Sequence, residues 1–206
     1  MNTDYRMSTQ RHIDENTDPE LSTLDLGCAE GSYVKRFKDI VGMDINEDTA
    51  KEYPGEVMIQ DARKKWKTDR KFDQILCIEM LEHIESMEDV NSILEQCSMH
   101  LKKGGSLVIH TPNRGRWTVF LKQLMGRPKK YPYYIVEQSR RKGKLTAFTQ
   151  VHYREFTLSE LAGLLESNGF SLDSAEIRFV DVPFINRGLD MRCSLGKALF
   201  AVARKK

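Results

Sequence analysis

The sequence predicts an α/β fold in which a parallel sheet is covered by helices on both faces. Short apolar runs alternate with segments of helical periodicity along most of the chain, which is the pattern of successive βαβ units. The 206 residues, 40% of them hydrophobic, are enough for one domain with a sizeable core. No run of about 18 apolar residues occurs, so neither a membrane span nor a secretion signal is expected.

The first predicted strand ends in a glycine turn. The apolar run Leu24–Leu26 leads into Gly27, and Gly31 follows four residues later, which predicts a strand, a tight turn and a helix start. Glycines allow the backbone to approach a ligand closely. The next apolar run, Ile40–Met43, ends in Asp44, where a carboxylate can accept hydrogen bonds from two ribose hydroxyls. These residues predict a site for a nucleoside cofactor.

The spacing of the turn argues against a dinucleotide. A dinucleotide fingerprint places glycines at positions i, i+2 and i+5, but these positions hold Gly27, Ala29 and Ser32. The acidic Glu30 would also repel a pyrophosphate. An adenosyl group that carries a cationic amino acid has no phosphate and tolerates an acid in this turn.

The later elements continue the alternation. The run Val57–Gln60 ends in Asp61 and Ala62, and the run Phe72–Ile78 ends in Glu79. A further strand is expected over Leu101–Ile109, and a late helix from Phe156 leads into a strand at Phe170.

The arrangement Asp25-x-Gly27-x-x-x-Gly31 with Asp44 resembles the class I S-adenosylmethionine-dependent methyltransferases. The resemblance implies a Rossmann-like domain over residues 21–206, with a parallel seven-stranded sheet, an antiparallel last strand and helices on both faces. It also implies S-adenosyl-L-methionine as cofactor, with the acid at position 61 meeting the adenine amino group. The implied cofactor-binding residues are Asp25, Gly27, Cys28, Ala29, Gly31, Asp44, Ile45, Asp61, Ala62, Ile78 and Glu79.

A basic insert over about residues 112–150 follows the fifth strand, where this family places substrate-recognition elements. Ten Lys and Arg residues and one acid between Arg114 and Lys144 give that segment a charge of +9, so the rest of the chain sums to −7. The helical stripe within it consists of Trp117, Phe120, Leu121, Leu124 and Met125. Residues 1–20 form either a lid over the cofactor or a disordered segment.

Three interpretations of the insert remain open. The helix packs on the substrate pocket with a solvated basic face, or it docks on an anionic membrane through apolar burial and basic flanks. In the third interpretation, the basic residues 114–144 bind the phosphates of RNA. This interpretation is weakened because no appended RNA-binding domain is expected in so short a chain.

The segment Glu79–His83 places two carboxylates and an imidazole at spacings that share one side of a helical turn. Adjacent carboxylates repel each other, and their negative charge would favour the protonated form of the neighbouring imidazole. A divalent cation would relieve this cost, and oxygen and imidazole ligands suit Mg²⁺, Mn²⁺, Fe²⁺ or Zn²⁺. Without a metal, Glu79 lines the methionyl end of the cofactor pocket and a histidine acts as acid or base.

The same segment is similar to Glu-x-x-Glu-His in the ubiquinone-pathway catechol O-methyltransferases and in the small-RNA 3′-terminal 2′-O-methyltransferases, where a later histidine completes the site. This implies Glu79, Glu82, His83 and His152 as metal ligands. Many metal-free methyltransferases share the pattern. If this chain resembles those members, its catalytic residues would be His83 and His152. His110, which ends the fifth strand, is a further pocket candidate.

The function expected from these features is O-methylation of a small or lipid-linked hydroxylated acceptor, with or without a metal. The alternative is 2′-O-methylation of RNA ribose, with the basic insert binding the RNA phosphates. The four cysteines, Cys28, Cys77, Cys97 and Cys193, show no metal-binding spacing, so reduced thiols in a cytoplasmic protein are expected, peripheral at the membrane if the insert docks there.

Overall fold

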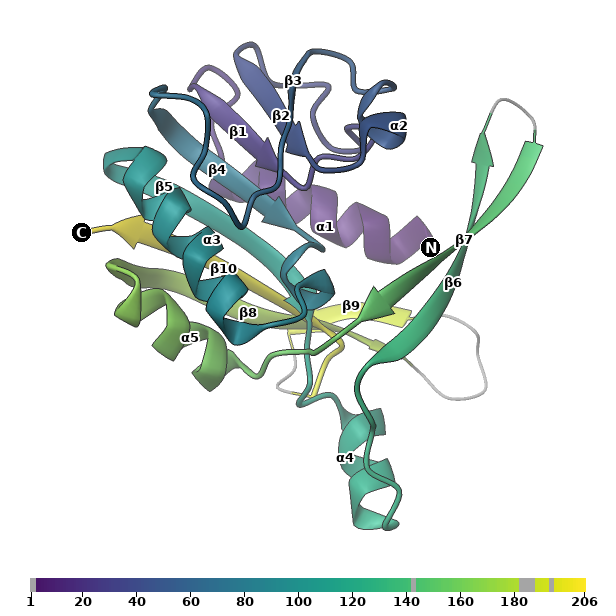
Figure 1. Cartoon of the computed structure of the whole chain (residues 1–206). Coiled ribbons are helices and arrows are strands. Elements are labelled where there is room, and N and C mark those ends of the chain that lie inside the picture. Colours follow the sequence, from purple (N-terminus) through teal and green to yellow (C-terminus); the bar gives the residue numbers. More distant parts are fainter. Residues whose placement is uncertain (1–2, 142–143, 182–187, 193–194) are drawn as a thin grey trace.

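An open sheet of eight strands forms the centre of the computed structural model, which describes residues 3–141, 144–181, 188–192 and 195–206 (Figure 1). Its strands are β1 (Thr23–Leu26), β2 (Ile40–Asp44), β3 (Glu56–Ile59), β4 (Phe72–Ile78), β5 (Leu101–Pro112), β8 (Phe170–Asp181), β9 (Gly188–Arg192) and β10 (Ala198–Lys205). They lie in the order β3-β2-β1-β4-β5-β10-β8-β9.

The sheet is parallel except at two strands. Strands β1 to β5 pair in parallel with their neighbours. The last strand, β10, is antiparallel to both β5 and β8. The predicted seven-stranded Rossmann-like arrangement with an antiparallel last strand is therefore confirmed. Strand β9, antiparallel to β8 at the edge, is an eighth strand that the sequence pattern did not predict.

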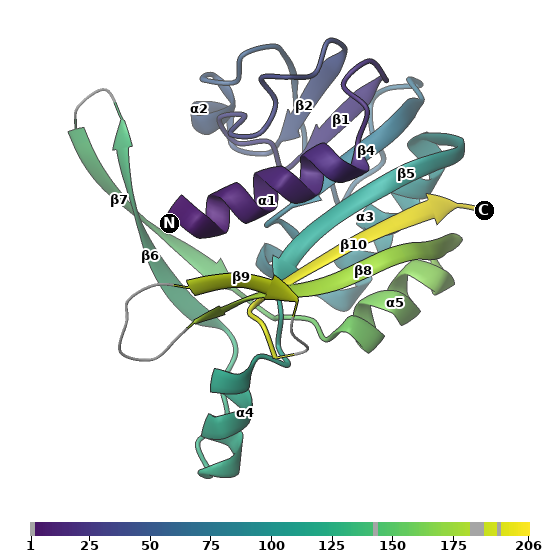
Figure 2. The same ribbon diagram turned by 180° about the vertical axis from the view of Figure 1, so that it is seen from behind.

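Helices cover both faces of this sheet, as expected. Helices α3 (Met87–His100) and α5 (Leu158–Ser167) lie on one face, and α1 (Thr3–Asn16) crosses the other (Figures 1 and 2). A capping box begins α5, because Thr157 and Glu160 each satisfy the other's backbone N–H. The short helix α2 (Glu47–Ala50) and the 3₁₀ helix η1 (Leu81–His83) follow β2 and β4. Among the described residues, no helix is both long and apolar enough to cross a membrane.

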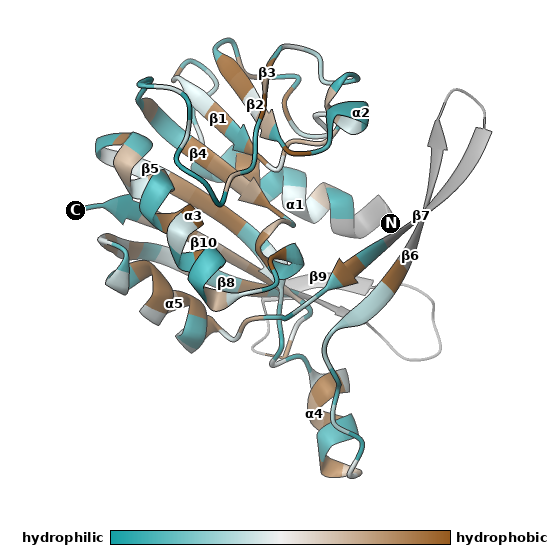
Figure 3. Ribbon diagram, viewed as in Figure 1, coloured by the Kyte–Doolittle hydropathy of each residue, from teal (hydrophilic) through white to brown (hydrophobic). Residues whose placement is uncertain are grey.

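The core lies between the sheet and these helices. Hydrophobic residues are concentrated on the central strands, with polar residues on the outer sides of the helices (Figure 3). Phe72, Phe170 and Phe200 are among the largest fully buried side chains. The described cysteines, Cys28, Cys77 and Cys97, are free and buried, whereas Cys193 lies outside the described residues.

The helix start predicted at Gly31 is wrong. Residues 27–39 form a series of turns, and their buried Val34 and Phe37 share a hydrophobic cluster with Ile13 of α1. The Arg36 guanidinium donates hydrogen bonds to the carbonyls of Ile13 and Thr17. Because α1 supplies the apolar cover and takes up the Arg36 donors, this segment is held in place without a helix of its own.

The insert forms two elements that project from the domain. Helix α4 (Trp117–Leu124) extends beyond the outline of the sheet, and β6 (Tyr133–Arg141) and β7 (Lys144–His152) form a separate hairpin (Figures 1 and 2). The hairpin register pairs Tyr133 with His152 at its base. Four basic residues of the insert have side chains that the structure does not describe: Arg140, Arg141, Lys142 and Lys144.

Replacing Gly31 by alanine is expected to destabilise the fold. Gly31 has φ +73°, and an added Cβ would lie 2.7 Å from Pro54 Cδ and 2.9 Å from Tyr53 Cδ2. We expect Gly31→Ala to lower the free energy of unfolding by about 1 kcal/mol or more, measured by urea denaturation. Gly163 is the matched control, because its Cβ would meet nothing within 4 Å. Gly163→Ala, within α5, should raise stability by about 0.5–1 kcal/mol; equal effects of the two substitutions would contradict this account.

Candidate active site

The glycine turn is fastened to the neighbouring strand. The N–H groups of Gly27 and Cys28 both donate to the Met43 carbonyl, at 2.8 and 3.1 Å. Gly27 has φ +72°, and a Cβ there would lie 2.8 Å from Cγ of Met80. The turn therefore passes closely over the carboxyl ends of β1 and β2, where an open α/β sheet binds its ligands.

Asp44 is held in place by backbone donors on both sides. Its Oδ2 accepts a hydrogen bond from the Ala29 N–H and its Oδ1 accepts one from the Asn46 N–H, each at 2.8 Å. Ala29 has a positive φ of 44° although it is not glycine, which is a strained backbone typical of functional sites. Each carboxylate oxygen keeps further acceptor capacity. The next residue, Ile45, is 63% exposed.

Asp25, in the strand before the turn, and Cys28, within the turn, are both buried. Asp25 is buried in β1, and burial together with the nearby Asp44 charge raises the pKa of its carboxyl to about 7. Burial likewise raises the pKa of the Cys28 thiol, so this cysteine is a thiol at neutral pH and not a reactive thiolate.

Asp61 and Ala62 follow β3 in a loop. Asp61 receives two hydrogen bonds from the Arg63 guanidinium, at 2.8 and 2.9 Å, and one from the Arg63 backbone N–H, and the hydrogen bonds from Arg63 lower the pKa of the Asp61 carboxyl. The Ala62 carbonyl accepts a hydrogen bond from Nε1 of Trp66. The loop thus has a fixed shape, with the Asp61 carboxylate held ionised.

Glu79 and Glu82 have different nearest partners. The backbone of Glu79 has φ +52°, its N–H donates to the His110 carbonyl, and its Oε1 lies 3.6 Å from His110 Nδ1. The 3₁₀ helix begins only at Leu81. The expectation that Glu79, Glu82 and His83 share one side of a single helical turn is therefore wrong for Glu79. Ile78, before it, is buried.

The structure brings Glu82, His83 and His152 together. One candidate ligand atom from each lies within 4.8 Å of the others, and the two imidazole rings are 4.7 Å apart at 86°. Two hydrogen bonds attach β7 to η1: His83 Nδ1 lies 2.8 Å from the Val151 carbonyl, and the Tyr153 N–H donates to the Glu82 carbonyl. Residues nearly 70 apart in sequence thus form one cluster.

Burial shapes the protonation of this cluster. Burial, and then the charge of Glu79, raise the pKa of the Glu82 carboxyl well above its usual value, although the Thr111 hydroxyl donates to its Oε2 at 3.0 Å. Burial, and then the charge of His83, lower the pKa of His152 to about 4. His152 is consequently neutral at pH 7.

Glu155 is a component of the site that the sequence analysis missed. Its buried carboxylate accepts two hydrogen bonds from Arg116 and one from Lys129, all at 2.8 Å. The hydroxyls of Tyr131 and Tyr133 donate to the same carboxylate. Burial alone would raise the pKa of Glu155, but the hydrogen bonds and charge of Arg116, with Lys129, hold it below its usual value. No local motif marks this residue, because its partners lie 22 to 39 positions away.

A second pair of histidines lies on the α1 side of the sheet. His110 is fully buried and its ring stacks on Phe200 at 4.4 Å, and burial lowers its pKa to about 3. His12 of α1, which has no sequence signal, lies 4.6 Å from the same phenylalanine ring. His110 therefore packs as a neutral ring, beside Glu79.

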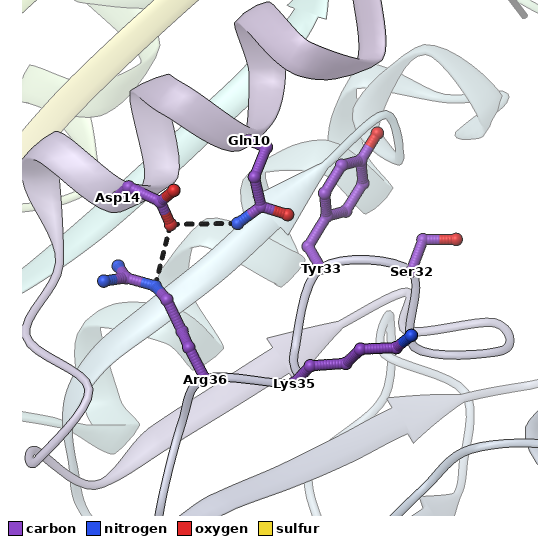
Figure 4. Close-up of a pocket in the computed structure, with 6 residues that line it drawn as sticks. All are labelled: Gln10, Asp14, Ser32, Tyr33, Lys35 and Arg36. Carbon is purple, nitrogen blue, oxygen red and sulfur yellow. Dashed lines mark hydrogen bonds and ion pairs between the residues drawn. The ribbon is translucent and has the colours of Figure 1, made fainter. Parts of the chain in front are cut away.

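A polar cavity of about 260 Å³ lies between α1 and the loop that follows Gly31 (Figure 4). Asp14 accepts a hydrogen bond from Gln10 and pairs with Arg36 across it. The residues that line the cavity are Gln10, Asp14, Ser32, Tyr33, Lys35 and Arg36. None of the residues predicted to bind the cofactor lines this cavity, so it marks the junction of α1 with the loop.

The apolar stripe of helix α4 is largely exposed. Val119 is its buried residue, whereas Phe120 is 59% and Leu124 76% exposed. Two of the basic residues expected on a solvated or phosphate-binding face, Arg116 and Lys129, are instead engaged by Glu155.

The strand order, the glycine turn after β1 and the acid at the end of β2 define a class I methyltransferase fold. A family model described as a methyltransferase domain matches residues 2–175. The chain belongs to this family of S-adenosylmethionine-dependent methyltransferases.

Individual relatives agree with this assignment. The chain is similar to the mitochondrial ubiquinone biosynthesis O-methyltransferase of Saccharomyces cerevisiae, with 27% identity over 76% of this chain and 56% of that protein. It is 31% identical to the ubiquinone biosynthesis O-methyltransferase of Aliivibrio fischeri over 44% of each. The chain thus spans about half the length of the curated relatives it matches.

Solved structures show the same fold. A S-adenosylmethionine-dependent methyltransferase of Clostridium acetobutylicum superimposes with a TM-score of 0.65 at 16% identity, covering 98% of this chain and 91% of that one. The CcbJ methyltransferase of Streptomyces caelestis gives a TM-score of 0.69 at 12% identity, covering 100% and 97%.

Proposed function

We propose that this protein transfers the methyl group of S-adenosylmethionine to a hydroxyl oxygen of a small or lipid-linked acceptor. The observation that supports this most directly is that the predicted donor-binding residues and the cluster of titratable side chains lie at the same edge of the sheet. The glycine turn and Asp44 lie at the carboxyl ends of β1 and β2, and the cluster of Glu82, His83 and His152 follows β4, the other neighbour of β1. Donor and acceptor would meet at this edge of the sheet, aligned for in-line displacement.

On the donor side, the residues would bind the nucleoside. Asp44 would accept hydrogen bonds from the ribose hydroxyls through the lone pairs that its two backbone contacts leave. Asp61 would accept from the adenine amino group, and the exposed Ile45 offers an apolar surface to the adenine ring. The glycine turn would let the backbone approach the methionyl part of the donor.

On the acceptor side, the cluster of Glu82, His83 and His152 fits a divalent cation. One carboxylate and two imidazoles converge, and a cation would offset the cost of an ionised, buried Glu82. Glu79 lies outside this group of three. When bound, Mg²⁺, Mn²⁺, Fe²⁺ or Zn²⁺ would supply positive charge that lowers the pKa of an acceptor hydroxyl.

In the absence of a metal, the histidines would supply the proton acceptor. His152 is neutral at pH 7 because its pKa is about 4, so its free nitrogen is available to a hydroxyl proton. General base catalysis of this kind is typically worth about 10²–10⁴-fold. His83 is the neighbouring candidate for the same role, since its ring lies against that of His152.

The relatives support an oxygen acceptor. Two of them are named as O-methyltransferases of ubiquinone biosynthesis, which favours a small or lipid-linked hydroxylated compound for this chain. They do not favour RNA, and Arg116 and Lys129 are already engaged by Glu155.

Helix α4 would bring such an acceptor from an anionic membrane surface. Its exposed apolar residues include Phe120, Leu121, Leu124 and Met125, and the exposed basic residues Arg114, Lys122, Arg127 and Lys130 surround them. Apolar side chains flanked by positive charge are what interfacial binding to anionic lipid requires.

Binding of the donor is expected to depend on Asp44. We expect calorimetry to show S-adenosylmethionine binding that Asp44→Ala weakens about 10–100-fold, because hydrogen bonds to a charged acceptor are lost. Asp48, whose side chain is 92% exposed, is the control, and Asp48→Ala should leave the affinity within about twofold. No binding by the parent protein would refute the cofactor assignment.

Binding of the cation is expected to depend on Glu82 and His152. Electron paramagnetic resonance should detect Mn²⁺ bound to the parent protein, with affinity reduced at least about tenfold in Glu82→Gln and His152→Ala, which each remove one ligand. The exposed Glu88 provides the control Glu88→Gln, with unchanged binding. Equal Mn²⁺ affinity in all four proteins, with full activity after chelation, would contradict the metal assignment.

Docking on lipid is expected to depend on α4. The protein should float with vesicles that contain phosphatidylglycerol and not with phosphatidylcholine alone, and salt should weaken the binding. Leu124→Asp should abolish flotation, because it places a charge in the apolar face. Leu21→Asp, at an exposed leucine away from α4, should float like the parent. Equal flotation of both variants would exclude α4 as the docking surface.

A further inference from the structure

We propose that Tyr133 is a positioning residue: its hydroxyl, anchored on Glu155, holds His152 in the tautomer that leaves Nε2 as the acceptor nitrogen. The inference rests on the proposed role of His152 as base or ligand, and it adds two residues to that role. Tyr133 does not itself need to touch donor or acceptor. It acts through the ring of His152.

The Tyr133 hydroxyl lies between two partners. It is 2.9 Å from Nδ1 of His152, and it makes a short hydrogen bond to Oε1 of Glu155. The three side chains thus form a continuous chain of hydrogen bonds that ends at the cluster with Glu82 and His83. Both Glu155 and His152 are buried, so water does not compete freely for these contacts.

Counting donors determines the direction of each bond. Glu155 is contacted by Arg116, through Nη1 and Nη2, and by Lys129, through Nζ. Guanidinium and ammonium groups can only donate, so the Glu155 carboxylate accepts from all of them. The single hydroxyl proton of Tyr133 goes to this carboxylate, since a charged acceptor is the stronger one. Only a lone pair of the Tyr133 oxygen then faces His152.

His152 must therefore donate from Nδ1. A neutral imidazole has one N–H, and placing it on Nδ1 leaves the lone pair on Nε2. His83 is oriented in the same way, because its Nδ1 lies 2.8 Å from the Val151 carbonyl, which can only accept. His152 thus keeps Nε2 for a proton or a cation, an arrangement typical of histidines oriented by a second partner.

The same contacts tie the insert to His152. Tyr133 and His152 are paired residues at the base of the hairpin, and Arg116 immediately precedes α4. The Lys129 ammonium also lies 3.5 Å from the centre of the Tyr133 ring. One carboxylate consequently fixes the start of α4, the segment after it and the hairpin against the histidine. The positions of the acceptor-side elements and the tautomer of His152 depend on the same group.

The test reads the tautomer directly. Nitrogen and carbon shifts of labelled histidines, measured at pH 8 on the whole protein, distinguish N–H at Nδ1 from N–H at Nε2, and the loss of signals in His152→Gln assigns them. We expect N–H at Nδ1 for His152 in the parent protein. Tyr133→Phe keeps the ring but removes the acceptor, so it should shift the population toward N–H at Nε2.

Tyr131→Phe is the matched control. Tyr131 donates to the same carboxylate, through Oε2, but its hydroxyl is not the one that meets His152. Its variant should keep the parent tautomer and Mn²⁺ affinity, whereas Tyr133→Phe should weaken Mn²⁺ binding about 10–100-fold. An Nε2–H tautomer in the parent, or an unchanged tautomer in Tyr133→Phe, would overturn the proposal. The tautomer is measured without donor, metal or acceptor, so its failure is distinguishable from a failure of the proposed methyl transfer.

Discussion

The buried carboxylate of Glu155 is the interaction on which the acceptor side of the molecule depends. Burying a carboxylate is costly unless it is paired and fully hydrogen-bonded, and here two basic residues and two tyrosines meet that requirement. These partners come from the segments before and after α4 and from the hairpin. Removing one charged partner from a buried ion pair typically costs about 3–5 kcal/mol, so the pairing of Glu155 with Arg116 and Lys129 gives the insert one strongly preferred arrangement against His152.

The donor side is organised by backbone instead. Parallel pairing brings the carboxyl ends of β1, β2 and β4 to one edge of the sheet, and main-chain N–H groups of the glycine turn fasten it to Met43 and Asp44. The positive φ angles at Ala29 and Glu79 lie at this same edge. The proposed donor site, fixed by backbone hydrogen bonds, therefore adjoins a proposed acceptor site built from side chains of η1 and of the inserted elements, which is how one fold can serve many acceptors.

Local patterns explain where sequence reasoning succeeded and failed. The strands around Leu24, Met43 and Leu76 are short apolar runs, so periodicity alone locates them. The helix expected at Gly31 does not form, because α1 packs on that segment and Arg36, within the segment, binds a carbonyl near the end of α1. Arg116 and Lys129 look like solvated charges in the sequence, since nothing local shows that a carboxylate 26 to 39 residues away will bury with them.

The sequence by itself determined the fold class and predicted the donor site, because both follow from residues close together in the chain: strands, glycines and the acids that end the strands. Only the tertiary structure decided which polar groups meet. It left Glu79 outside the group that joins Glu82 and His83 to His152, and it placed Glu155 behind that group. Contacts across such sequence separations are selected by burial and hydrogen-bond satisfaction in the folded state, which leave no periodic pattern in the chain.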